Sequence, residues 1–244
     1  MKKMDKIFVL GQGVLKELIR RKDLYLIIIL LLVIVLYAAS FSFGGESGFH
    51  RYFKEVGISF TYIFSVIIGI MFAARQIPQE VESKTIYSLL ARPLSRLEFI
   101  LGKFFGVFFV TIVSFSIFYL VFIASLFMHG DFTTPPVLLA EGYILHAALL
   151  SFFVSLAILL SLFLSTLANM VVSVILYFGT NWFGATFPAY IFLPHPELFD
   201  IKEKIIHTQD IVPLWVMVFL VVYAAVYTAL FLALAYAAFR RRNL

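Results

Sequence analysis

Long apolar runs separated by short polar segments are the main pattern along this chain. A helix rises about 1.5 Å per residue and the hydrocarbon layer of a bilayer is about 30 Å thick, so about 20 apolar residues can cross it once. Backbone amides in lipid must be satisfied within their own segment, and the period-2 alternation of a membrane barrel is absent, so these runs are expected to be helices. The sequence therefore predicts an all-α integral membrane protein, with residues 1–244 as a single transmembrane domain. Its six predicted spans are 24–43, 56–74, 99–128, 137–165, 168–193 and 211–239.

The composition agrees with this class. The chain is 62% hydrophobic and 14% charged, whereas soluble domains are roughly 45–50% apolar and about 25% charged. It has no cysteine, which excludes disulfides, thiolate metal sites and cysteine nucleophiles. The first apolar run is too long for a signal peptide and no small-residue cleavage site follows it, so we expect it to be retained. The net charge of +5 has to be interpreted by location, and it does not indicate nucleic-acid binding.

The basic residues are distributed unequally between the two sides of the predicted spans. Of the 19 Lys and Arg, only Arg51, Lys54, Lys202 and Lys204 fall on one side. The others lie near the two termini or between 75 and 103. Short cytoplasmic loops collect Lys and Arg, so both termini are predicted to be cytoplasmic in a multi-pass protein of the inner (plasma) membrane.

Residues 1–23 combine basic residues with an apolar stripe at helical spacing. Ile7, Leu10, Val14 and Leu18 form this stripe, which predicts an amphipathic helix in the headgroup plane with lipid as its partner. The alternative is that the basic residues only orient the terminus. Two glycines, Gly11 and Gly13, predict a break or a weak middle.

The segment between the fifth and sixth spans is longer than the other outer segments and rich in proline. Between its prolines, Glu197 to His207 is predicted to form a short helix. Its apolar stripe is expected to lie on the outer leaflet or dip into it, as a re-entrant or interfacial segment. The stripe consists of Leu198, Ile201, Ile205 and Ile206.

The loop after the second span contains the most informative pattern. Pro78 suits the first turn of a helix, and Glu80 and Glu82 follow where the helix dipole favours anions. Pro93 stops the helix, so a short helix over 78–91 is predicted. Glu80 and Lys84 are spaced as a surface pair on it. A helix this short cannot bury its own apolar face, which must lie on the bilayer or dock into a partner.

A second signal follows Pro93. The residues Ser95-Arg96-Leu97-Glu98 have the form of a capping box, which predicts that a new helix opens here and continues into the third span.

These residues resemble the signature loop of ABC transporter permeases of the second exporter class, which have the type V exporter fold. The resemblance lies in the order of an acidic residue, a Thr, Leu-Leu, Arg-Pro-Leu-Ser-Arg and Gly-Lys. It extends to six spans, an amphipathic N-terminal helix and a re-entrant segment between spans five and six. The nearest subgroup contains the permease of the nitrous-oxide reductase maturation transporter, and Lys84 departs from the Gly that relatives often carry. The motif positions in this chain are Glu80 or Glu82, Thr85, Leu89-Leu90, Arg92 to Arg96 and Gly102-Lys103.

The resemblance implies a function and partners. The 78–91 helix would be a coupling helix that inserts into a groove of a separate ABC ATPase subunit. ATP and Mg would bind that subunit, and this chain would bind no cofactor. Two permease copies, as a homodimer, would join two ATPases in an exporter. The implied interface residues are Glu80, Glu82, Lys84, Thr85, Leu89, Arg92 and Arg96.

Two other functions remain open. The sequence lacks the GxxxxGK[ST] loop of an ATPase, so the chain is not expected to be an enzyme by itself. A secondary transporter or channel would need an ionisable residue at mid-membrane, and the sequence indicates none in the span centres. An intramembrane enzyme would use Glu141 and His146 as its least implausible pair. The five histidines are interpreted as interfacial residues, or as an outward metal or proton site.

A few polar residues inside the spans are further candidates, because polar groups are costly in lipid and face a partner helix or a cavity. Thr180 and Asn181 are the candidates for a translocation path. Asn169, earlier in the same predicted span, is a further polar candidate. The alternative for each is an interhelical hydrogen bond. Gly102 and Gly106 form a small-xxx-small pair that permits close approach of another backbone.

Overall fold

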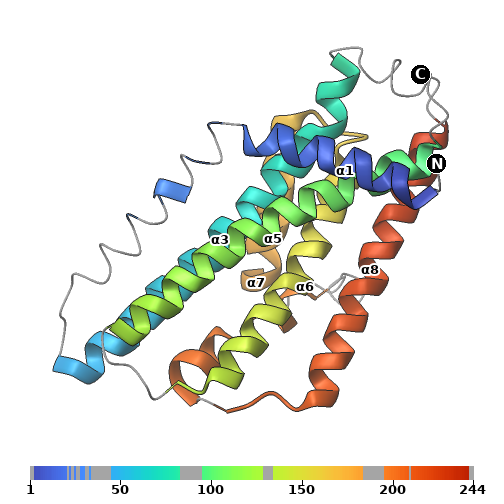
Figure 1. Ribbon diagram of the computed structural model, residues 1–244. Helices are drawn as coiled ribbons and strands as arrows, with labels where there is room; N and C mark the ends of the chain where they lie inside the picture. The colour runs from blue at the N-terminus through green and yellow to red at the C-terminus, as the bar shows by residue number, and fades with distance from the viewer. Residues whose placement is uncertain are drawn as a thin grey trace.

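The computed structural model describes residues 3–20, 45–82, 95–128, 134–183, 195–208 and 210–241, together with single positions between 22 and 33. All regular structure in these ranges is helical (Figure 1). The main helices are α1 (Lys3–Ile19), α3 (Gly45–Glu82), α5 (Arg96–Met128), α6 (Pro136–Leu160), α7 (Thr166–Phe183) and α8 (Leu214–Arg241).

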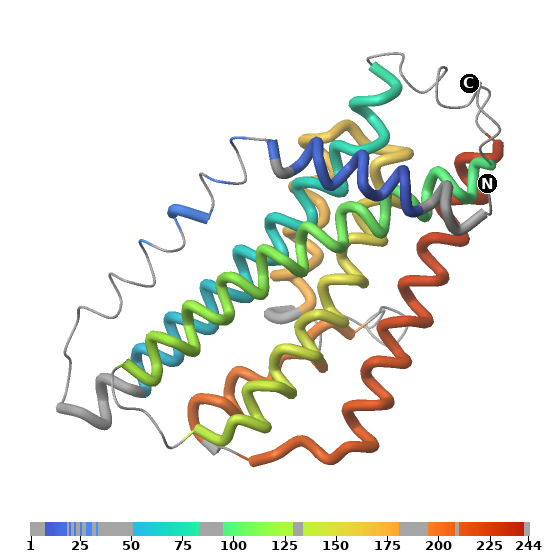
Figure 2. The backbone as a smooth tube through the Cα atoms, in the orientation of Figure 1, coloured from blue at the N-terminus to red at the C-terminus, as the bar shows by residue number. Residues whose placement is uncertain are grey.

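The long helices form an elongated bundle, and α1 lies across one end of it. Helices α3 and α5 run side by side in opposite directions, and α6 packs between them and α8 (Figures 1 and 2). Aromatic side chains fill the centre, among them Phe72 of α3, Phe115 and Phe122 of α5 and Phe153 of α6, all fully buried. The core therefore consists of apolar side chains from helices that are far apart in sequence.

Four of the described helices are long and apolar enough to cross a membrane, and α7 is a shorter apolar helix. The described region thus has the helices expected of a multi-pass membrane protein. The third, fourth and sixth predicted spans coincide with α5, α6 and α8 to within a few residues. Most of the first predicted span and residues 184–193 of the fifth lie outside the described residues.

The start of α5 confirms the predicted capping box. The backbone N–H of Ser95 donates to Oε2 of Glu98 at 2.8 Å, and the N–H of Glu98 donates to Oγ of Ser95 at 3.2 Å. Two N–H groups that the first turn leaves free are satisfied in this way.

The end of α3 differs from the expectation. Pro78 lies inside α3, which continues to Glu82, so no new helix begins at this proline. The missing N–H of Pro78 removes one intrahelical hydrogen bond, but the helix continues with the remaining ones. Residues 83–91 of the expected 78–91 helix lie outside the described residues.

The N-terminal helix is continuous through Gly11 and Gly13, which corrects the expected weak middle. Val14 and Leu18 of its apolar stripe are buried, and α1 packs on α5. Val14 and Leu18 of this face therefore make protein contacts.

The segment before α8 also packs on protein. It forms a 3-10 turn, Pro196–Phe199, and a π-helical turn, Lys204–Thr208, in place of one regular helix. Ile201 and Ile205 of its predicted stripe are buried, whereas Leu198 is exposed. The two turns contact α3, α6 and α7, so this part of the stripe is covered by helices.

Candidate functional site

The helix ends that flank the loop 83–94 meet at one end of the bundle. We call this end the basic end, defined by Lys16, Arg20, Arg75, Arg96, Lys103, Arg240 and Arg241. In the last turn of α3, Glu80 forms an ion pair with Lys103 of α5. The Lys103 ammonium also donates to Oε1 of Gln76 at 3.1 Å and lies 5.7 Å from the ring centre of Phe99. A buried ammonium requires such partners because burial removes its hydration.

A second connection joins α5 to the end of α8. Nη1 of Arg96 donates to the carbonyl oxygens of Phe239 and Arg240 at 2.7 and 2.8 Å. These carbonyls belong to the last turn of α8, where no N–H of the same helix is available, and a cation is favourable there. The rings of Phe99 and Phe239 stack with centres 5.5 Å apart, which adds apolar contact at the same point.

The described residues on both sides of 83–94 are therefore cross-linked to the bundle. Glu80 holds the end of α3, and the capping box and Arg96 hold the start of α5. Glu82, the last residue of α3, is exposed. The other predicted interface residues, Lys84, Thr85, Leu89 and Arg92, lie outside the described residues.

Lys103 and Gln76 were missed as structural partners by the sequence interpretation. It paired Glu80 with Lys84 and treated Lys103 only as the end of a motif. A charge placed in the apolar run 99–128 was the available signal, because such a charge must find a partner in the bundle.

Glycines allow α1 to cross α5 at this same end. An added Cβ on Gly106 would lie 2.6 Å from Cβ of Val14 and 3.0 Å from the carbonyl oxygen of Gly11. An added Cβ on Gly11 would lie 3.6 Å from the carbonyl oxygen of Gly102. The predicted small-residue pair is therefore the crossing point of α1.

A buried histidine lies near the middle of the bundle. His146 of α6 is 1% exposed, its Nε2 lies 2.7 Å from Oγ of Ser65, and its ring stacks on Tyr62 with centres 4.0 Å apart. The expectation that the histidines are interfacial is wrong for this residue. Its position inside the 137–165 run was the available sequence signal, but its burial depends on the helices around α6.

Glu141 has a different role from His146. Its Oε2 accepts a hydrogen bond from the backbone N–H of Val212 at 2.9 Å and so connects α6 to the segment before α8. The proposed enzyme pair thus has separate partners in the structure. Among the described residues, no group of three or more His, Cys, Asp or Glu could hold a metal ion.

The polar candidates of α7 form hydrogen bonds within the bundle, either to α6 or within α7 itself. Nδ2 of Asn169 donates to the carbonyl oxygen of Ala157 at 2.8 Å, and Ser173 donates to Oδ1 of Asn169 at 3.1 Å. Asn169 therefore joins α7 to α6. This is the interhelical hydrogen bond predicted from the sequence as the alternative to a translocation path. Thr180 donates to the carbonyl oxygen of Leu176 in its own helix at 2.8 Å. Asn181 lies within α7, but its side chain is outside the described part of the structure.

Long apolar helices and the basic residues gathered at one end define a multi-pass helical membrane protein. Residues 16–184 match the ABC-2 family transporter protein family, and because this covers more than half of the chain, the protein belongs to that family. It is thus a membrane permease of the ABC transporter type, a transmembrane component for which an ABC ATPase partner is implied. A comparison with curated proteins gives no match.

Proposed function

We propose that this chain is the permease subunit of an ATP-driven exporter in the inner membrane, with both termini in the cytoplasm. In this proposal it spans the membrane six times. ATP and Mg bind and react on a separate ATPase subunit, and this chain transmits the resulting motion to a substrate path. By its loop motif we place it near the nitrous-oxide reductase maturation permeases.

The observation that supports the proposal is the double anchoring of the loop 83–94. Glu80 with Lys103 ties the start of the loop to α5, and Arg96 ties its end to α8. A force applied to a loop held this way acts on three helices at once. This is the mechanical property that a coupling element requires, and we propose that it follows α3 within 83–91. The residues proposed to contact the ATPase are Glu82, Lys84, Thr85, Leu89 and Arg92, with Glu80 and Arg96 as anchors.

We further propose that two copies form the exporter through α7. Leu167, Val171 and Ile175 lie on one face of this helix, and each is more than half exposed. Thr180 and Asn181 follow in the same helix, so a substrate path between two copies would be near them. The homodimer and the path are both part of the proposal.

The test is charge reversal at an exposed contact in the permease–ATPase complex. Glu80 is unsuitable alone because its ion pair with Lys103 is structural. Glu82→Lys changes an exposed carboxylate at the end of α3 and is expected to lower ATP turnover several-fold while the complex stays folded. Glu55→Lys, an exposed carboxylate near the other end of α3, is the matched control. Wild-type turnover in Glu82→Lys together with unchanged ATPase binding contradicts the assignment of this contact.

A secondary transporter is the alternative, and His146 is the observation that favours it. A buried imidazole in a membrane bundle is a candidate for proton coupling. Under this alternative, substrate uptake into vesicles proceeds without the ATPase, follows a pH gradient, and is lost in His146→Gln. Under the proposed function, transport requires the ATPase and persists in that variant.

A further inference from the structure

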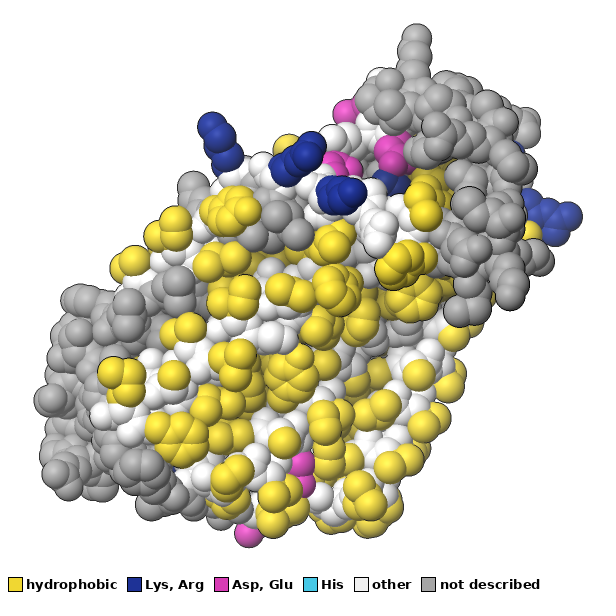
Figure 3. All heavy atoms as spheres, viewed as in Figure 1, with side chains coloured by type: hydrophobic (Ala, Val, Ile, Leu, Met, Phe, Trp, Pro, Cys, Tyr) yellow, Lys and Arg dark blue, Asp and Glu magenta, His cyan; other side chains and the backbone are white. Residues whose placement is uncertain are grey.

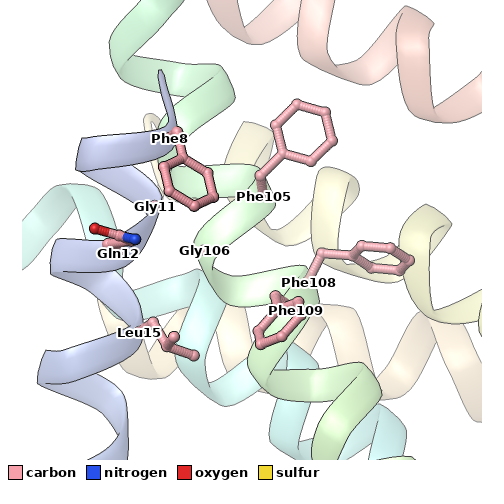
Figure 4. A pocket seen from close by; sticks show the side chains of 8 residues that line it. All are labelled: Phe8, Gly11, Gln12, Leu15, Phe105, Gly106, Phe108 and Phe109. Carbon is pink, nitrogen blue, oxygen red and sulfur yellow. The ribbon is translucent and has the colours of Figure 1, made fainter. Parts of the chain in front are cut away.

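An apolar groove lies between α1 and α5 at the basic end (Figure 4). It has a volume of about 640 Å³, within the range of about 300–1,000 Å³ typical of small-molecule sites. Phe8 and Phe105 lie at one end of it and Leu15 and Phe109 at the other, with Gly106 between them. Gln12 is its one polar lining side chain among the described residues.

The aromatic walls of the groove are open. Phe8, Phe105 and Phe109 are 66%, 51% and 56% exposed, although they are among the largest apolar side chains of the protein. The exposed face of α5 continues from Phe109 through Val113 to Leu120. The groove is therefore continuous with the exposed apolar face of α5.

Basic residues continue along α1 from the polar lining residue Gln12. Lys16 follows Gln12 by one helical turn, and Arg20 follows Lys16 by another, and both are exposed. Figure 3 shows Lys and Arg side chains above a broad hydrophobic surface, over α1. Glu17 lies between them in sequence, and it is partly buried and has an interaction of its own.

These two features specify the chemistry of an occupant. It must be apolar where it contacts the phenylalanines and negatively charged where it reaches Lys16 and Arg20. A protein segment docked here would have to displace lipid from a surface that opens onto the bilayer. An anionic phospholipid has both parts in the required order and is already present in the surrounding membrane.

We propose that the groove between α1 and α5 is a binding site for one anionic phospholipid, with an acyl chain along Phe105 and Phe109 and the headgroup at Lys16 and Arg20. The lipid would then stabilise the contact between α1 and α5 at the level where the loop 83–94 is anchored. This site is independent of the proposed ATP coupling, and its test uses no ATP.

The experiment measures which lipid lies beside the groove in the full chain reconstituted in bilayers. Phe109→Trp, with both native tryptophans replaced by Phe, provides a fluorescent reporter. Quenching is compared between bilayers of phosphatidylcholine with a minor fraction of brominated phosphatidylglycerol and bilayers in which the same fraction is brominated phosphatidylcholine. Phe219→Trp in the same background is the control, because Phe219 is an exposed phenylalanine of α8 that does not line the groove.

The expected result is at least about twofold stronger quenching of Trp at 109 by the anionic lipid, and no difference at 219. Lys16→Gln with Arg20→Gln removes the preference at 109. Equal quenching by both lipids overturns the proposal, because the groove then holds bulk lipid. Absence of quenching also overturns it, because protein then closes the groove.

A second measurement needs no tryptophan replacement. Phosphatidylglycerol that remains bound to the detergent-purified chain is counted by native mass spectrometry. One bound lipid is expected for the wild-type chain and for Arg51→Gln, and none for Lys16→Gln with Arg20→Gln. Equal retention by all three overturns the site.

Discussion

Gly106 of α5 lies so close to Val14 of α1 that a Cβ added to it would be 2.6 Å from the Cβ of Val14. Real Cβ atoms do not approach this closely, and Val14 is buried with a branched side chain that cannot move aside. The docking of α1 on the bundle thus requires glycine at position 106, because any larger side chain would clash with Val14.

Gly106→Ala is predicted to force α1 away from α5. The free energy of unfolding is expected to fall by about 1–3 kcal/mol, the usual cost of overpacking a contact. The measurement is thermal unfolding of the purified chain together with the rate at which protease removes α1.

Gly13→Ala is the matched control for this change. No atom lies within 4 Å of a Cβ added there, and Ala favours the helix over Gly by up to about 1 kcal/mol. Equal stability loss in both variants would contradict a specific effect at the crossing, because Gly13→Ala creates no close contact.

Lys103→Met is predicted to destabilise the basic end by about 3 kcal/mol, because it removes the ammonium that faces Glu80 and Gln76. Glu80→Gln combined with Lys103→Met is expected to recover part of this loss, since the double variant removes both charges of the ion pair. Stability of the two single variants and the double variant, measured as a cycle, gives the coupling. Additive single effects would contradict the ion pair as an energetic link.

Gly142→Ala is predicted to displace the segment before α8. A Cβ at this position would meet Cδ1 of Ile205 at 2.9 Å and the hydroxyl oxygens of Tyr62 and Tyr119 at 2.9 and 3.0 Å. Both hydroxyls donate to carbonyl oxygens of α6, so they cannot shift without losing a hydrogen bond. We expect a loss of about 1–3 kcal/mol and faster proteolysis between 195 and 212.

Gly179→Ala separates this contact from a general effect of replacing glycine in a span. A Cβ at 179 has no atom within 4 Å. The contact is disproved if Gly179→Ala and Gly142→Ala are equally stable and equally resistant to protease.

Val171→Cys tests the proposed pairing of two copies through α7. The chain contains no cysteine, so a single thiol in each copy is the only target for a bismaleimide cross-linker. A covalent dimer is expected for Val171→Cys in membranes. Val113→Cys, on the exposed face of α5, should remain monomeric, and the reverse pattern would place the dimer interface on α5.

Local patterns predicted the parts of the fold that depend on neighbouring residues. Ser95 and Glu98 are three residues apart, and their reciprocal hydrogen bonds are local, so the start of α5 could be found without any tertiary information. The same reasoning was wrong at Pro78. A proline is compatible with the first turn of a new helix and with the interior of a continuing one, and the packing of α3 against α5 and α6 decides between them.

In the candidate site, too, the sequence predicted local features and missed contacts between helices. The sequence identified Glu80, Glu82 and Arg96 as residues of interest but missed Lys103 as a partner of Glu80, because Lys103 lies on another helix. Lys84, the partner predicted for Glu80, lies outside the described residues. His146 was placed at an interface because its depth in the bundle depends on which helices surround α6. The glycine pair at 102 and 106 was recognised, but its partner α1 was not.

The sequence by itself determined the class of protein, the approximate ends of most described spans and the asymmetry of charge between the two ends. These follow from local physics, since a backbone in lipid must form its own hydrogen bonds and an apolar run of sufficient length becomes a helix. The tertiary structure alone decided that α1 crosses at Gly106, that Lys103 neutralises Glu80 and that Ile205 fits against Gly142. Those contacts depend on the shapes of side chains that are distant in sequence, and the order of residues along one helix does not contain that information.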